Sequence, residues 1–336
     1  MKPSTAITAS APSRIDLAGG TLDIWPISLL VPDAVTVNLA IELRAEVTLE
    51  PMGERKLIAR SRDRGKQATR RLPLRREDAH GPLGLLIRLV AAFEPERGLK
   101  LTSCAAAPAG AGLGGSSTLA MATGAALARW TGRRLAPRDL LQRVMNVETV
   151  ELGVPTGNQD YLAAQHGGLS AYQHGPDGTR RKPIEIPRGL SERLVLAYTG
   201  QPRHSGFSNW EMYRRFVEGE RVTVRRMESI ARIARELQDA LTDGDLDAAG
   251  KLIGEEGRLR YSLAPSVATD ALRHADRAAR KAGALGVKVC GAGGGGCLVA
   301  FAAAGRTESV ARAIEATGAS LLPVKIARRG LRVTAP

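Results

Sequence analysis

The sequence predicts an α+β fold, and three observations lead to this expectation. The chain has 336 residues, which is enough for one large domain or two ordinary ones with real cores. Runs that alternate apolar and polar residues mark the first 50 residues as strands, whereas residues 208–283 have a long helical pattern. Because strands and helices are clustered rather than strictly alternating, the α+β class is favoured. We place a domain boundary within residues 185–195, where no linker-like composition marks it.

The N-terminal strands are predicted from alternation. TVNLAIELRAEVTLE (36–50) alternates apolar and polar residues, which is the pattern of a half-buried strand. KLIAR (56–60) is a further expected strand inside a densely basic stretch, residues 54–79. A solvated hairpin and an anion-binding face both account for this basic stretch.

The later elements follow in chain order. LGLLIRLVAAF (83–93) reads as a buried helix, LKLTSCAAA (99–107) as a strand, and Ser116 to about Trp130 as a helix of small residues. Residues 135–153 form a helix with Pro137 in the first turn, where the missing N–H costs little. The other expected elements are strands at 168–174 and 193–200, three or four helices within 208–283 broken at Gly244, Gly257 and Pro265, a strand–turn–strand unit at 287–303, a helix at 309–319 and a strand at 321–327.

Charge and composition restrict the partners and the compartment. The net charge of +14 favours anionic partners such as nucleotides, phosphorylated substrates, nucleic acid or a membrane face, although a GC-rich coding bias produces the same arginine-rich composition. No apolar run approaches the roughly 18 residues of a membrane span, and no secretory signal is evident. Three cysteines without a CxxC pair indicate reduced thiols. We therefore expect a cytoplasmic protein without a membrane partner.

The segment PAGAGLGGSST (108–118) carries the strongest chemical signal. It joins a strand to a helix, and its glycines allow backbone N–H groups to approach a ligand. The start of the following helix offers unpaired N–H groups and a partial positive charge, which together suit a phosphate. Ser116 and Ser117 either cap this helix or place a hydroxyl on a Mg²⁺ ion that bridges nucleotide phosphates.

Other interpretations of this segment fit less well. The Walker pattern fails because no lysine precedes the serines. A Rossmann pattern matches at Gly110, Gly112 and Gly115, but it lies in mid-chain, and no acidic residue about 20 positions later follows an evident second strand. A tight strand-to-helix turn without a ligand stays open.

The segment ELGVPTGNQDYLAAQHGG (151–168) supplies a candidate catalytic carboxylate. Asp160 follows a Pro–Gly turn, where a carboxylate either orients an acceptor hydroxyl and takes its proton or simply caps the next helix. Glu148 lies on the preceding expected helix. It is either a second Mg²⁺ ligand or a solvated helix residue.

Two further glycine segments say little by themselves. VCGAGGGGCLVAF (289–301) also contains a GxGxxG pattern, but a strand follows it, so it is a turn between paired strands or a backbone that passes close to a ligand. APSRIDLAGGTLD (11–23) places Arg14 and Asp23 beside an apolar strand and a Gly-Gly turn. The five histidines show no zinc spacing, and no GxSxG elbow is present.

Taken in chain order, these segments resemble the GHMP kinases, the family of galactokinase, homoserine kinase, mevalonate kinase and phosphomevalonate kinase. APSRIDLAGGTLD is similar to the first motif of that family, PAGAGLGGSST to the second and VCGAGGGG to the third. The resemblance implies a two-domain fold, with an N-terminal domain (1–190) like ribosomal protein S5 domain 2 and a ferredoxin-like C-terminal domain (191–336). ATP and Mg²⁺ are the implied cofactors, bound with the acceptor in the cleft between the domains.

Within the family, the chain is most similar to the branch of D-glycero-D-manno-heptose 7-phosphate kinase and fucokinase. Both the turn from Glu148 to Asp160 and the segment TGQPRHSGFSNWE (199–211) resemble segments of that branch. The chain departs from the pattern at Leu22, which stands beside Asp23 where a threonine is usual, and at the following Trp25-Pro26. These changes lie at the expected acceptor wall and leave the sugar identity open.

The resemblance implies a role for each matching residue. Catalysis would rest on Asp160, as base or hydroxyl-orienting carboxylate, and on Arg14, which would stabilise the transferred charge. The Mg²⁺ ligands would be Ser116 and Glu148. The nucleotide contacts would come from Pro108, Gly110, Gly112, Leu113, Gly114, Gly115, Ser116 and Ser117, and the acceptor contacts from Asp23, Gly19, Gly20, Gly293, Gly294, Gly295 and Arg203.

The sequence therefore predicts an ATP-dependent small-molecule kinase, a monomer or homodimer, with a sugar or sugar-phosphate acceptor. A mevalonate- or homoserine-type kinase is the alternative within the family. A nucleic-acid-binding protein on an S5-like scaffold would use the basic stretch, but it lacks interleaved aromatic residues and leaves the acidic residues unexplained, so nucleic acid is not the expected partner. A kinase-like sensor without activity is disfavoured by the intact Asp160.

Overall fold

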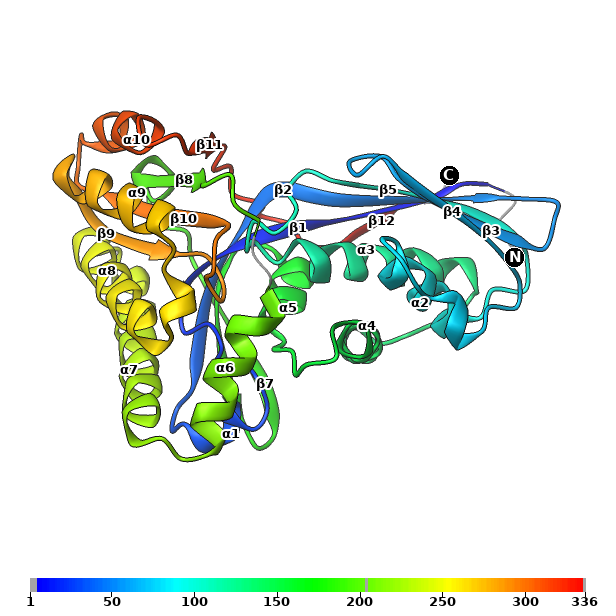
Figure 1. Cartoon of the computed structure of the whole chain (residues 1–336), viewed down its shortest axis with the longest axis horizontal. Coiled ribbons are helices and arrows are strands. Elements are labelled where there is room, and N and C mark those ends of the chain that lie inside the picture. Colours follow the sequence, from blue (N-terminus) through cyan, green and yellow to red (C-terminus); the bar gives the residue numbers. More distant parts are fainter. Residues whose placement is uncertain (1–4, 203–204, 335–336) are drawn as a thin grey trace.

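The computed structural model describes residues 5–202 and 205–334, and it divides into two parts along its longest axis (Figure 1). One part is built on an eight-stranded sheet with the order β12-β1-β2-β5-β3-β4, to which β6 and β7 are attached through β2. The other contains a four-stranded sheet with the order β11-β8-β10-β9. The predicted α+β class is confirmed.

The strands of the large sheet are mostly antiparallel, with one parallel pair between β3 and β5. Its members are β1 (Ile7–Ala18), β2 (Val35–Pro51), β3 (Lys56–Ser61), β4 (Lys66–Arg71), β5 (Leu99–Ala105), β6 (Leu169–Gly175), β7 (Gly178–Ile184) and β12 (Arg332–Thr334). The small sheet consists of β8 (Leu194–Tyr198), β9 (Ala284–Val289), β10 (Cys297–Ala302) and β11 (Ser320–Leu322).

The helices separate into two groups. Four helices lie on one side of the large sheet, with α4 outside α3, as Figure 1 shows: α2 (Gly84–Phe93), α3 (Gly115–Trp130), α4 (Pro137–Leu152) and α5 (Gln159–His166). The second group belongs to the other part of the molecule, together with the short α1 that packs against it: α1 (Ile27–Leu30), α6 (Ser205–Val217), α7 (Arg221–Asp243), α8 (Leu246–Leu263), α9 (Asp270–Lys281) and α10 (Thr307–Glu315). No helix in the described part of the chain is long and apolar enough to cross a membrane.

The expected elements and the observed ones agree for the main strands and helices, with some differences. Helix α1 and strands β7 and β12 were not expected. Gly257 does not break a helix but lies inside α8, because its missing side chain lets the helix touch β9. The expected strand at 321–327 is only partly formed as β11, and Ile326 instead makes an isolated bridge to Ile41 of β2.

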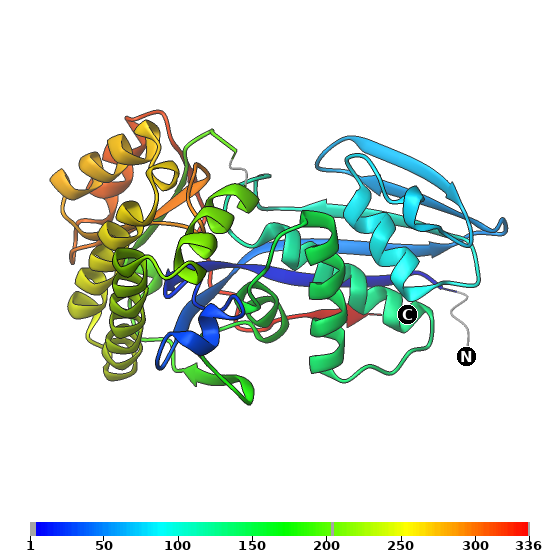
Figure 2. The ribbon, with the colours of Figure 1, turned by 60° about the horizontal axis from the view of Figure 1, so that its bottom comes forward.

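The two long strands β1 and β2 connect the two parts of the molecule. The first residues of β1, such as Ile7 and Ala9, pack in the core under α2 and α3, whereas Ile15 and Leu17 pack in a core shared with α7 and α8. Strand β12 pairs with β1, so the first and last strands lie side by side (Figure 2). The small sheet begins at Leu194, and the predicted boundary at 190/191 stays a prediction.

Candidate functional site

The glycine-rich segment at residues 108–118 contains the turn between β5 and α3. Gly110, Gly112 and Gly114 have positive φ angles of 71°, 81° and 73°, which L side chains rarely adopt. Helix α3 begins at Gly115 with Gly114 as its N-cap, and no side chain caps it. The alternative in which Ser116 or Ser117 caps the helix is therefore wrong, and the first N–H groups of α3 are left for a ligand.

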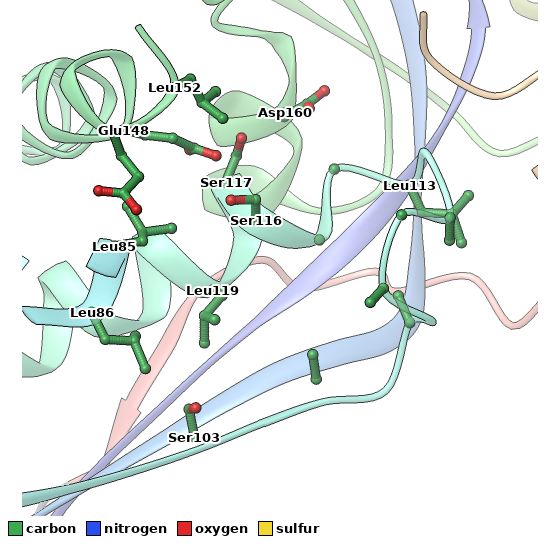
Figure 3. Close-up of a pocket in the computed structure, with 18 of the residues that line it drawn as sticks. Leu85, Leu86, Ser103, Leu113, Ser116, Ser117, Leu119, Glu148, Leu152 and Asp160 are labelled. Atoms are coloured by element: carbon green, nitrogen blue, oxygen red, sulfur yellow. The ribbon is translucent and has the colours of Figure 1, made fainter. Parts of the chain in front are cut away.

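A cavity of about 500 Å³ lies beside this turn (Figure 3). Residues 108–117 all line it, as do Glu148 and Asp160. Beyond the turn, the cavity continues between α2 and the ends of β3 and β5, where leucines and polar residues both line it. The side chains of that far end include Ser61, Arg64, Pro82, Leu83, Leu85, Leu86 and Ser103.

Glu148 is a buried carboxylate at the start of α3. Its side chain is 2% exposed, and Tyr161 donates a hydrogen bond from its hydroxyl to Oε2 at 2.5 Å. Burial raises the pKa of Glu148, and the nearby hydroxyls of Ser116, Tyr161 and Ser117 offset this effect only in part. A carboxylate and a hydroxyl that meet at a phosphate site are the oxygen ligands that Mg²⁺ prefers, so Ser116 and Glu148 fit that ion.

Asp160 and Arg14 form an ion pair beside the turn. Asp160 Oδ1 accepts hydrogen bonds from Arg14 Nε at 2.8 Å and is 2.6 Å from Arg14 Nη2. Nη1 of the same guanidinium donates to the carbonyl of Gly112 at 2.7 Å. Burial opposes the charge on Arg14, but Asp160 and Asp16 outweigh this effect and raise its pKa. The side chain of Asp160 is still 22% exposed, so it is open to a ligand.

Gly114 allows this arrangement because it lies directly against Asp160. A Cβ atom on Gly114 would be 3.1 Å from Cγ of Asp160, in a backbone conformation that already disfavours a side chain. The phosphate-type turn and the candidate catalytic carboxylate are therefore in contact.

Asp23 lies behind the turn that precedes α5. Its two oxygens accept hydrogen bonds from the backbone N of Gln159 at 2.9 Å and from Nε2 of Gln159 at 3.2 Å. The side chain is 6% exposed, and burial raises its pKa to about 6. The negative charge of Asp160, the next residue after Gln159, contributes to this increase.

Arg14 and Asp23 do not line the cavity, and neither do the predicted glycines of the first and third segments. Gly19 and Gly20 form the turn after β1, and a Cβ on Gly19 would be 2.0 Å from the carbonyl oxygen of Val35. The β9–β10 turn contains Gly293, Gly294 and Gly295. This part of the chain packs against the glycine-rich segment 108–118 through a hydrogen bond from Cys297 N to the carbonyl of Ala111. Arg203 lies outside the described residues.

Sequence reasoning missed a group of buried charges beside the site. Asp16, Glu256, Arg260 and Lys288 are all fully buried. Lys288 had a usable signal, because it is the lone charge in the apolar strand β9, whereas Asp16 shares β1 with Arg14. Glu256 and Arg260 had none, since α8 is rich in charged residues throughout.

Known proteins are similar to this chain in sequence and in fold. Residues 83–168 match the model of the GHMP kinases N terminal domain, and residues 228–320 match that of the GHMP kinases C terminal domain. The mevalonate kinase of Thermococcus sibiricus is 30% identical over 243 residues, which cover 71% of this chain and 70% of that protein. The D-glycero-alpha-D-manno-heptose 7-phosphate kinase of Campylobacter jejuni is 27% identical over 199 residues, 58% of each protein.

The structural comparison agrees over nearly the whole chain. The galactokinase of Lactococcus lactis, solved in complex with galactose, superposes with a TM-score of 0.81 at 19% identity and covers 97% of this chain and 95% of that one. The two-domain fold expected from the sequence motifs is thereby confirmed. With both family models matched in order, and with a 30% identical relative over two thirds of its length, the chain belongs to the GHMP kinase family and is an ATP-dependent phosphotransferase.

Proposed function

We propose that this kinase transfers the γ-phosphate of Mg²⁺–ATP to a hydroxyl of a sugar or sugar phosphate. The observation that carries the proposal is the contact between three elements: the glycine turn, the Arg14–Asp160 pair, and the buried carboxylate of Asp23 behind residue 159. The donor phosphate, the Asp160 carboxylate that orients the acceptor hydroxyl and the Asp23 carboxylate that binds further hydroxyls would then lie next to one another in space, in this order.

The nucleotide would occupy the cavity with its phosphates at the glycine turn. The first N–H groups of α3 carry the partial positive charge that favours phosphate oxygens. The base would lie at the far end, where Leu83, Leu85 and Leu86 of the α2 region supply apolar contacts. The sequence alone supplied no residues for binding the adenine.

Ser116 and Glu148 would hold the Mg²⁺ ion. When bound, the ion neutralises charge on the phosphates. The hydroxyl of Tyr161 already donates a hydrogen bond to Glu148, which helps to hold this carboxylate in place before any ligand arrives.

Asp160 would orient the acceptor hydroxyl. The hydroxyl oxygen forms a bond to the γ-phosphorus, the bond to the β–γ bridging oxygen breaks, and ADP leaves. The hydroxyl proton passes to the carboxylate of Asp160. Arg14 holds that carboxylate through its Nε and Nη2 atoms, and its positive charge lies beside the glycine turn, where negative charge develops.

Asp23 favours a hydroxyl-rich acceptor. Each carboxylate oxygen has a second lone pair beyond the hydrogen bond from Gln159, so a sugar hydroxyl can still donate to it. The second candidate is mevalonate kinase activity, because the Thermococcus mevalonate kinase is a more similar relative than the heptose kinase. A mevalonate pocket would need fewer hydroxyl partners than a sugar pocket.

An ADP-release assay with Mg²⁺–ATP and a panel of acceptors tests the proposal. The panel contains heptose 7-phosphate, mannose, galactose, fucose, glucuronate, mevalonate and homoserine. ADP release that depends on one of the sugars supports the sugar kinase. Release with mevalonate alone contradicts it and establishes the second candidate. An Asp160→Asn preparation in the same assay shows how much ATPase comes from contaminants.

A further inference from the structure

Four fully buried charged side chains lie together where α8 and β9 meet β1. Nζ of Lys288 is 2.9 Å from Oδ2 of Asp16 and 3.6 Å from Oε2 of Glu256. Arg260 donates from Nε to Oε1 of Glu256 at 2.9 Å. The four side chains are 0% exposed, and their charges sum to zero. We call Asp16, Glu256, Arg260 and Lys288 the buried charge cluster.

Glycines of α8 bring the cluster together. A Cβ on Gly257 would be 2.1 Å from the carbonyl oxygen of Val287, and a Cβ on Gly254 would be 2.7 Å from Cα of Gly286. Helix α8 therefore lies directly on the backbone of β9. This close approach places Glu256 and Arg260 beside Lys288, which enters the interior from the same strand.

The cluster reaches the turn that leads to Asp23. Arg260 donates from Nη2 to the carbonyl of Gly20 at 2.8 Å and from Nη1 to Oγ1 of Thr21 at 3.4 Å. Thr21 has a φ of 79°, an uncommon conformation for a β-branched residue. Asp16 packs against the other side of this turn, because its Oδ2 would be 2.2 Å from a Cβ on Gly20. The turn is thus held between two members of the cluster.

Stability is a poor explanation for this arrangement. Buried ion pairs lose about as much in desolvation as they gain in attraction, and apolar residues of similar volume often replace them without loss. Moreover, Oδ1 of Asp16 and Oε2 of Glu256 have no hydrogen-bond partner in the described part of the chain. The cluster thus contains polar atoms without hydrogen-bond partners among the described residues, yet it is hydrogen-bonded to a strained turn. A role in fixing the geometry of that turn explains this arrangement better than a role in stability.

We propose that Arg260 and Lys288 are positioning residues through which the C-terminal part of the chain fixes the turn Gly19–Asp23 for the acceptor. Arg260 acts on the turn directly, and Lys288 acts through Asp16 and Glu256. None of the four cluster residues lines the nucleotide cavity, so nucleotide binding is independent of them. The acceptor part of this inference rests on the proposed function, whereas the ordering of the turn does not.

Arg260→Lys is the decisive variant, because it keeps the charge but loses the fork that bonds Glu256 and Gly20 together. Arg280→Lys is its matched control: Arg280 also pairs with an acid four residues away, at 2.6 Å from Asp276, and contacts the carbonyl of Val287 but not the turn. For Arg260→Lys we expect the acceptor KM to rise at least tenfold. The affinity for a non-hydrolysable ATP analogue, measured by calorimetry, should stay within twofold, and Arg280→Lys should leave both unchanged.

Hydrogen exchange gives a second readout that needs no acceptor. Amides of the turn, including Leu22 and Ile24, which bond to Gly19 and Thr21, should exchange at least tenfold faster in Arg260→Lys, while those of residues 110–118 do not change. The double variant Asp16→Asn/Lys288→Met tests the role of Lys288 without leaving an unpaired buried charge, because it removes two charges of opposite sign. It should show the same rise in acceptor KM.

Three results would overturn the proposal. They are unchanged exchange at the turn, an unchanged acceptor KM, or a loss of nucleotide affinity in parallel with acceptor affinity. A wild-type enzyme that is silent on every acceptor contradicts the proposed function instead. The exchange measurement then still decides whether Arg260 orders the turn.

Discussion

Asp160 is the residue on which the chemical assignment depends most. It is fixed by Arg14 from a position 146 residues earlier, yet one fifth of its side chain is open to the cavity. Sequence motifs indicated both residues. Their direct pairing could not be deduced from spacing, because it depends on how β1 and α5 pack against each other. The same holds for Lys288, whose lone charge in an apolar strand predicts a buried partner without saying which one.

Asp160→Asn should remove most of the turnover while it spares nucleotide binding. The amide keeps the shape but cannot take the hydroxyl proton, and general-base contributions are typically about 10²–10⁴-fold. Steady-state kinetics and calorimetry with an ATP analogue check the two expectations. Asp139→Asn is a matched control, since Asp139 also lies in the first turn of a helix but faces solvent. Full turnover in Asp160→Asn would refute the catalytic assignment.

Asp23 should make both stability and acceptor binding depend on pH. Its pKa rises from 3.8 in the unfolded chain to about 6 in the fold, so the folded state binds the proton more tightly. The resulting stability is fully present below pH 4 and is lost as the pH rises through 6. The shift of about two units corresponds to a loss on the order of 3 kcal/mol.

Urea unfolding of wild type and Asp23→Asn at pH 4, 5, 6 and 7 measures this loss. The wild-type stability should fall relative to the variant across that range and then level off. Acceptor kcat/KM should rise with an inflection near pH 6, as the carboxylate that accepts sugar hydroxyls ionises. A constant difference between the two proteins at all four pH values would contradict the buried, proton-binding role of Asp23.

At the scale of elements, periodicity predicted the strands and helices whose burial is regular. The alternation in residues 36–50 gave β2, and the apolar run at 83–93 gave α2. Strand β7, GTRRKPI, was missed because five of its seven residues are exposed and its centre is a run of three basic residues, so no alternation marks it. Gly257 was misread because helix propensity counts glycine as a breaker, whereas contact with β9 requires it.

Gly257→Ala should therefore destabilise the protein although alanine is the better helix former. The new Cβ would meet the carbonyl oxygen of Val287 at 2.1 Å, and such overpacking typically costs about 1–3 kcal/mol. Gly175→Ala is the control, because a Cβ there has no atom within 4 Å. Urea unfolding measures both. Equal stability of Gly257→Ala and wild type would show that α8 does not need this close contact.

At the scale of the whole molecule, the two-domain fold could not be derived from residue patterns. It followed from the resemblance of three glycine segments to a family, which the comparisons bear out. Among the described residues, only ones from 61 to 160 line the cavity, all in the N-terminal part, whereas the resemblance implied a nucleotide site between the domains. Neither the residue patterns nor the family resemblance predicted that the end of the chain returns to the large sheet. Residues 325–331 run beside β2 and the end of α5, through hydrogen bonds between Ala327 and Ala40 and between Gly168 and Ala327. The N-terminal part is thus completed by residues from the far end of the chain.

Two truncations separate the contributions of this returning segment. A chain that ends at Leu331 loses the short pairing of the exposed strand β12 with β1, and it should be about 1–3 kcal/mol less stable than wild type. A chain that ends at Pro323 also loses the bonds to Ala40, Glu42, Gln165 and Gly168, and at about 1 kcal/mol for each net hydrogen bond it should be several kcal/mol less stable. Because Gln165 and Asp160 share α5, the shorter chain should also lose turnover even at temperatures where it stays folded. Equal thermal unfolding and equal kcat for the two truncations would instead mean that α5 is held by the large sheet alone.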